Sequence, residues 1–235
     1  MKKISILKVT ALAVAVGMSA SENVKAQSVN AGADFVSSYV WRGVFQGNAG
    51  PAFQPTLSLT TGNFTVGAWG STDFNAAKEF DLYVGYSIGN FSLTLTDYWW
   101  EGQGSAKYFD YSDNTTNHWF ETSLGYNFGE SLPLTLTWNT MVLGKDKDSN
   151  GDAMYSSYFE TKYSTKVQEV AVDLGLGIVP FKSDLYGTDG LAVTNVFVKG
   201  TKQVKVSDSF TLPVYVQAIF NPRAEQTHLV VGVTF

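Results

Sequence analysis

Residues 227–235 read Thr-His-Leu-Val-Val-Gly-Val-Thr-Phe, and this segment is the clearest sign of the fold class. Its side chains alternate between two chemical kinds. One face carries Thr227, Leu229, Val231, Val233 and Phe235, and the other carries His228, Val230, Gly232 and Thr234. Strict alternation predicts a β-strand with two different faces, because successive side chains of a strand point to opposite sides.

The same alternation recurs through residues 27–235, and no helical repeat competes with it. The expected strands lie at 29–42, 53–61, 64–74, 79–88, 91–100, 118–128, 132–143, 154–163, 167–178, 191–199, 209–220 and 226–235. The connections alternate in kind: 62–63, 89–90 and 164–166 are tight, whereas 43–52, 101–117, 144–153 and 179–190 are long. Short turns at one end and long loops at the other are typical of an outer-membrane barrel.

The chain length agrees with this number of strands. Residues 27–235 provide about 17 residues for each of twelve strands with its connection, and a spanning strand needs about 9–11. With sixteen strands, too few residues would remain for the long loops. With eight strands, too many would remain for connections that include tight turns. A barrel of ten strands is the nearest alternative. We therefore expect an all-β fold, a closed antiparallel transmembrane β-barrel of about twelve strands in an up-and-down meander.

The amino terminus predicts export. Lys2, Lys3 and Lys8 precede the short apolar run 9–18, and small residues precede a cleavage site after Ala26. Residues 1–26 are therefore expected to be a signal peptide, and 27–235 the barrel domain, in the outer membrane of a Gram-negative bacterium. The apolar run is too short for a membrane anchor, since a spanning helix needs about 20 residues.

Aromatic residues are expected to form two girdles on the lipid face. One girdle would contain Phe64, Phe91, Phe128, Tyr163, Phe210 and Phe235, and the other Trp41, Phe53, Phe74, Phe80, Trp99, Phe120, Tyr155 and Phe220. A soluble β-sandwich, the alternative, should instead present polar side chains outward.

The composition excludes several classes of function. The chain has no cysteine, which excludes disulfides and thiol chemistry, and two histidines, which excludes histidine-rich metal sites. Its formal net charge is −5, which argues against nucleic acid as a partner.

Residues 37–46 read Ser-Ser-Tyr-Val-Trp-Arg-Gly-Val-Phe-Gln and are followed by Pro51-Ala52-Phe53-Gln54. Together with Gly67-Ala68-Trp69-Gly70-Ser71 and the acidic strand 79–86, this region resembles the TorF-type porin family. The resemblance covers residues 37–100 and is only architectural beyond them. It implies an outer-membrane barrel, suggests a pore, and defines neither a substrate nor catalytic residues; the family often has a smaller polar residue in place of Phe45. The terminal Phe235 resembles the signal that the barrel assembly machinery recognises.

Alternation also predicts which side chains face the lumen. The expected inward charges are Asp34, Arg42, Glu79, Asp81, Glu121, Glu160, Lys162, Glu169, Asp173 and Lys199. Acids outnumber bases, so an open lumen should favour cations; alternatively, the charges pair across the barrel and plug it. For Arg42 we expect a structural ion pair with Asp34, Glu79 or Asp81 rather than a ligand-binding role.

Aromatic side chains are also expected inside the barrel: Trp69, Tyr83, Tyr98, Trp100, Trp119, Tyr158 and Tyr215. Such rings either line a sugar path or simply fill a narrow barrel. The loop 146–152 reads Asp-Lys-Asp-Ser-Asn-Gly-Asp, and Asp146, Asp148, Asn150 and Asp152 are candidate Ca²⁺ ligands. The loop lacks the glutamate of an EF-hand at its twelfth position, so a solvated hairpin loop is the alternative. No other cofactor is expected.

The sequence therefore predicts a channel in outer-membrane lipid for passive diffusion of small hydrophilic solutes, weakly cation-selective or sugar-conducting. One rival is a closed structural barrel whose loop 101–117, rich in Tyr, Asp and Asn, binds a partner outside the cell. The other is a lipid-face enzyme that uses His118 or His228, although neither histidine has a serine two residues away on its strand. We expect no enzymatic activity.

Overall fold

The computed structural model describes residues 27–235, apart from 48–49, 76–77, 102–106 and 114. The predicted signal peptide, 1–26, lies outside the described residues. In chain order the strands are β1 (Gln27–Val36), β2 (Tyr39–Trp41), β3 (Val44–Gln46), β4 (Ala52–Thr61), β5 (Phe64–Thr72), β6 (Lys78–Ile88), β7 (Phe91–Glu101), β8 (His118–Asn127), β9 (Leu134–Gly144), β10 (Ser157–Val167), β11 (Val170–Val179), β12 (Ala192–Lys205), β13 (Thr211–Asn221) and β14 (Gln226–Thr234). No helix in this part of the chain is long and apolar enough to cross a membrane.

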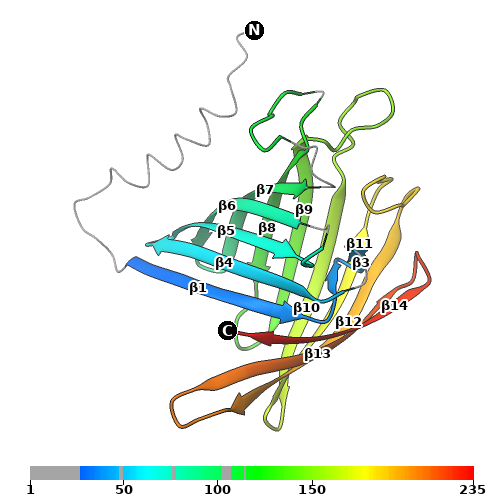
Figure 1. The fold of residues 1–235 in the computed structure, drawn as a ribbon. Helices are drawn as coiled ribbons and strands as arrows, with labels where there is room; N and C mark the ends of the chain where they lie inside the picture. Colours follow the sequence, from blue (N-terminus) through cyan, green and yellow to red (C-terminus); the bar gives the residue numbers. More distant parts are fainter. Residues whose placement is uncertain (1–26, 48–49, 76–77, 102–106, 114) are drawn as a thin grey trace.

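All strands except β2 and β3 form one closed barrel of twelve (Figure 1). Wall strands that follow one another in sequence pair antiparallel, and β14 closes the ring against β1. Closure leaves the wall without a long free sheet edge. The predicted closed antiparallel meander of twelve strands is therefore confirmed.

The two faces of the wall differ in chemistry. On the outer face, aliphatic side chains are exposed, among them Leu57 (55%), Leu93 (49%) and Leu229 (66%). On the inner face, large rings lie over glycines of the neighbouring strand. A Cβ at Gly67 would lie 2.4 Å from the ring of Tyr83, and one at Gly232 would lie 2.3 Å from the ring of Tyr215. These glycines give the inward rings room inside a narrow barrel.

The first wall strand is shorter than the predicted segment 29–42. The prediction is wrong for residues 37–42, which do not belong to the wall. β1 ends at Val36, and its ladder with β14 contains only three pairs, from Asp34↔Thr234 to Val36↔Gly232. The last contacts are made by Ser37, whose backbone N donates to the carbonyl of Val231 (2.8 Å). The chain then leaves the wall and turns into the barrel.

The inward segment is a small hairpin made of β2 and β3, in which Trp41 pairs with Val44. Its turn has positive φ at both central residues, 51° at Arg42 and 80° at Gly43. This is the backbone of the two-residue turns that suit hairpins. A Cβ at Gly43 would lie 1.9 Å from the carbonyl oxygen of Thr194 on β12, so only glycine fits there. The Asn221 side chain of β13 donates to the Gly43 carbonyl (3.0 Å) and fixes the tip.

Candidate functional site in the lumen

Arg42, at the tip of the hairpin, forms an ion pair across the lumen with Glu121 of β8. Nη1 lies 2.6 Å from Oε1 and Nη2 lies 2.8 Å from Oε2, a bidentate arrangement. The Glu121 side chain is 1% exposed and that of Arg42 is 12% exposed. Charge-assisted bidentate pairs are strong and directional. The predicted partners of Arg42 (Asp34, Glu79 and Asp81) are therefore wrong, because the hairpin carries Arg42 away from the wall position on which that prediction rested.

Aromatic side chains enclose this ion pair. The guanidinium carbon lies 4.4 Å from the centre of the Trp41 ring and 4.8 Å from that of Tyr158. The Tyr98 hydroxyl donates to Glu121 Oε2 (2.9 Å), and Arg42 Nη1 donates to the Tyr186 hydroxyl (2.6 Å). We call Glu121, Tyr98, Tyr158, Tyr186 and Trp41 the guanidinium cage. It combines a carboxylate with ring faces, the two groups that attract a planar cation.

Trp41 was expected in an aromatic girdle on the lipid face, and that prediction is wrong. Its ring stacks on Tyr186 inside the barrel, with centroids 5.6 Å apart and planes 12° apart. It also contacts Tyr98 and Trp100, whose rings stack on each other at 5.3 Å. The reversal follows from the hairpin, because residues 37–46 no longer obey the inside–outside alternation of the wall.

Tyr186 was not identified from the sequence. It lies in the connection between β11 and β12, where Ser183 is fully buried and donates to Ser156 Oγ (2.7 Å). The Tyr186 backbone N donates to Ser183 Oγ (3.3 Å). This connection therefore also folds into the lumen. No periodic signal marks it, because side-chain alternation carries no information about a loop.

Two further acids lie on the inner face beside the cage. Glu79 is 7% exposed and Asp81 is 4% exposed. Asp81 Oδ1 accepts a bond from the backbone N of Trp99 (3.3 Å), whereas Glu79 Oε1 has no hydrogen-bond partner. Within the described residues, neither carboxyl forms a salt bridge. The end of the lumen that carries the long loops thus holds more acid than base.

The opposite end of the lumen, beside the short turns, is polar and more open. Its inward side chains are half-buried hydroxyls, including Thr60, Thr65, Ser92, Thr94, Thr135 and Thr137. Farther around the ring, Ser164 Oγ donates to Asp173 Oδ1 (2.6 Å). Lys199 Nζ lies 3.8 Å from the centre of the Tyr215 ring. The barrel is therefore hydrophilic at one end and filled at the other.

The register places the predicted lumenal charges on the inner face of the wall, except Glu169 and Arg42, which lies in the lumen at the tip of the hairpin. Glu169 lies in the tight turn between β10 and β11, where its side chain is 83% exposed and 3.6 Å from Lys202 Nζ. The predicted inward position of Glu169 is therefore wrong, because β11 begins at Val170, three residues later than the predicted segment 167–178. The predicted lumenal rings, the seven from Trp69 to Tyr215, all lie on the inner face.

The two histidines lie on opposite faces of the wall. His228 points into the lumen and stacks on Phe45 of the hairpin, with centroids 5.8 Å apart. His118 is fully buried on the outer face, where Nδ1 lies 2.7 Å from Asp97 Oδ1 and Tyr111 stacks on its ring at 4.1 Å. Burial raises the pKa of Tyr111 above its ordinary value. The described residues 107–113 of the connection between β7 and β8 therefore lie against the outside of the barrel.

The predicted Ca²⁺ ligands do not converge. Asp146 is buried and accepts bonds from Ser156 N (2.7 Å) and Ser156 Oγ (2.6 Å). Asp148 Oδ1 accepts from the backbone N of Asn150 (2.8 Å) and of Asp152 (2.9 Å). Within the described residues, no group of three His, Cys, Asp or Glu side chains is placed to hold a metal ion. The carboxylates stabilise the loop itself, so the residues present do not fit that site.

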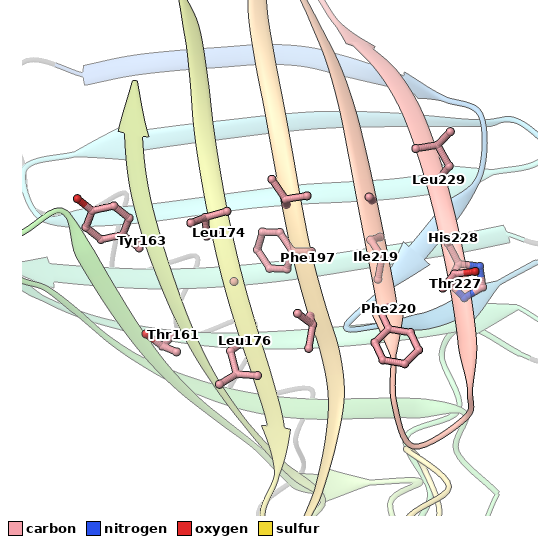
Figure 2. A pocket seen from close by; sticks show the side chains of 14 residues that line it. Thr161, Tyr163, Leu174, Leu176, Phe197, Ile219, Phe220, Thr227, His228 and Leu229 are labelled. Carbon is pink, nitrogen blue, oxygen red and sulfur yellow. The ribbon is translucent and has the colours of Figure 1, made fainter. Parts of the chain in front are cut away.

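A groove of about 830 Å³ runs along the wall from β10 to β14 (Figure 2). Outward side chains line most of it, with Tyr163, Leu174, Leu176, Phe220 and Leu229 among those labelled. It is an apolar depression of the outer face and contains none of the cage residues.

The comparisons with known proteins give a family and two distant structural likenesses. A triple mutant of the porin from Rh. blastica is 14% identical over 78% of this chain, with a TM-score of 0.41, and this chain covers 55% of that porin, about half its length. The translocator domain of the autotransporter NalP from Neisseria meningitidis is 13% identical, covering 98% of this chain and 94% of that domain, with a TM-score of 0.34. No curated protein matches the chain.

Residues 20–178 match a family described as bacterial proteins of unknown function, Gcw_chp. The match covers the strands β1 to β10 and most of β11, and with them the hairpin and Glu121. The resemblance to the TorF-type family is not tested by this match. The chain therefore belongs to the Gcw_chp family of bacterial proteins.

Proposed function

We propose that this protein is an outer-membrane channel for small hydrophilic solutes, which the β2–β3 hairpin holds closed in the state described here. The observation that carries the proposal is the Arg42–Glu121 pair, which ties the hairpin across the lumen. A permanent plug could be built from apolar packing alone. An ion pair can instead exchange its partners. We call the Arg42–Glu121 pair the latch.

The outer face supports a location in a membrane. Exposed leucines, valines and phenylalanines cover it, and such a surface is stable only against hydrocarbon. In lipid every backbone polar group must be paired, which the closed ladder provides. Export through a signal peptide cleaved after Ala26, and assembly guided by Phe235, complete the proposal.

The charge of the lumen supports a preference for cations. Glu121 pairs with Arg42 at the end of the lumen that carries the long loops, so withdrawal of Arg42 leaves a carboxylate there without its cation. A narrow, low-dielectric passage with excess carboxylate concentrates cations relative to anions. Aromatic rings in the same region would offer apolar faces to a passing solute.

Planar-bilayer recording tests the proposal. The refolded wild-type chain should show rare openings, and Arg42→Asn should show frequent discrete steps whose reversal potential in a salt gradient indicates cation preference. Arg223→Asn is the matched control, since it removes the other arginine, which forms an exposed pair with Asp189 (3.0 Å). If Arg42→Asn is folded and silent, the barrel is closed permanently and the channel proposal fails.

A further inference from the structure

We propose that the guanidinium cage is a binding site for a guanidinium-bearing cation, for which Arg42 substitutes while the hairpin is closed. The inference rests on the proposed channel, because the site lies on its path. It adds the chemical class of the solute and the way in which that solute opens the latch.

The first argument is that the barrel supplies every residue of the cage except Trp41. Glu121 and Tyr98 belong to wall strands β8 and β7, and Tyr158 belongs to β10. Tyr186 is held in place by the buried Ser183. Only Trp41 moves with Arg42. A withdrawn hairpin would therefore leave behind a preformed carboxylate, two hydroxyl groups and a ring face.

The second argument is geometric selectivity. The two Glu121 oxygens accept two parallel bonds from Arg42, at 2.6 and 2.8 Å, while Tyr98 fixes the orientation of Oε2. The Tyr158 ring lies 4.8 Å from the guanidinium carbon. A planar fork fits both features, whereas a compact ammonium can satisfy only one carboxylate oxygen well. The site is thus expected to prefer guanidinium to ammonium and to neutral urea.

The third argument links binding to opening. Glu121 is buried, and a buried carboxylate that loses its cation is strongly destabilised. Withdrawal of Arg42 is therefore unfavourable unless another cation takes its place. A solute that binds the withdrawn state and not the closed state shifts the equilibrium toward opening. Arg42 is tethered, so it competes at a high effective concentration and makes the apparent affinity of the free cation weak.

Two more acidic side chains lie beside the cage. Glu79 is more than nine-tenths buried, and its Oε1 has no hydrogen-bond partner. Arg42 neutralises Glu121, yet Glu79 and Asp81 lie on the neighbouring inner wall without a salt bridge in the described part of the chain. A cation that enters the cage would meet this second acidic group.

The turn allows the cage to be emptied without disrupting the hairpin. Arg42 and Gly43 both have positive φ, and asparagine followed by glycine is the preferred pair for this turn. Arg42→Asn therefore removes the guanidinium and keeps the turn. Arg42→Lys keeps the charge and removes the fork, so it serves as the matched variant.

Binding is measured on refolded protein in detergent micelles by calorimetry and by thermal unfolding, with low-millimolar guanidinium chloride as the probe. Arg42→Asn should bind it saturably and at least tenfold more tightly than the wild type, and its melting temperature should rise. Equal concentrations of sodium chloride, ammonium chloride or urea should give no such rise. Arg42→Lys should bind more weakly than Arg42→Asn.

The double variant Arg42→Asn/Glu121→Gln separates a specific site from a general salt effect. It should lose saturable binding while remaining folded, as judged by heat-modifiable migration on a gel. The inference is overturned if folded Arg42→Asn shows no saturable binding, or if the double variant binds equally well. Binding together with a silent bilayer would instead contradict the channel and leave the cage standing, so the two proposals fail separately.

Discussion

His118 and Asp97 form a buried pair on the outside of the barrel, with Nδ1 2.7 Å from Oδ1 and both residues on wall strands. His118 Nε2 also contacts the carbonyl oxygen of Tyr108. The imidazole therefore joins two neighbouring strands to the segment 107–113 of the connection between them. Neither nitrogen is left available to a substrate, so the pair serves to hold the connection.

Removing one partner of this pair should release the connection. For His118→Asn we expect the free energy of unfolding to fall by about 3 kcal/mol, because the buried carboxylate of Asp97 loses its histidine partner. Limited proteolysis should then cut within residues 107–117 faster than in the wild type. Asp97→Asn/His118→Asn should recover part of the stability. Equal protection of the connection in wild type and His118→Asn would show that the pair does not hold it.

The barrel could be predicted from alternation, whereas this pair could not. Asp97 interrupts the apolar face made by Phe91, Leu93 and Leu95, and that single departure was the signal for a covered outer site. The hairpin was missed for a different reason. Residues 39–42 alternate as well as a wall strand does, and alternation within one segment cannot show whether the segment pairs with β14 or folds back on itself.

The buried Arg42–Glu121 pair should stabilise the folded state far more than an exposed ion pair does. Glu121→Gln leaves Arg42 buried beside a neutral amide, and we expect the free energy of unfolding to fall by about 3 kcal/mol. Asp189→Asn breaks the exposed pair with Arg223, whose side chain is 45% exposed, and should cost less than about 1 kcal/mol. Equilibrium unfolding in urea measures both losses. Equal losses would mean that the lumenal pair is solvated in the folded barrel.

Gly43 offers a way to displace the hairpin without removing any charge. In Gly43→Ala the new Cβ would lie 1.9 Å from the Thr194 carbonyl oxygen, so the tip must move away from β12. Bilayer recordings should then show more frequent openings than the wild type, with Arg42 still present. The control is Gly151→Ala, where φ is also positive (87°) and no atom lies within 4 Å. That control should cost about 1–2 kcal/mol of loop stability and leave conductance unchanged; a matching change in both variants would exclude the hairpin as the gate.

The loop 145–156 should lose its order in acid. Backbone N–H groups of Asp152 and Asn150 donate to Asp148 and hold the pKa of that carboxyl below its ordinary value of 3.8. A carboxyl whose pKa is lower in the folded state stabilises the fold above its unfolded pKa, and that contribution disappears as the pH falls through the folded pKa. Protection of this loop from an acid protease should therefore decline below about pH 4. In Asp148→Asn the loop should be cut faster than in the wild type at pH 4, and the ratio of the two rates should approach one as the pH falls, because an asparagine does not titrate. A wild-type loop whose protection is constant down to pH 2 would show that these hydrogen bonds do not order it.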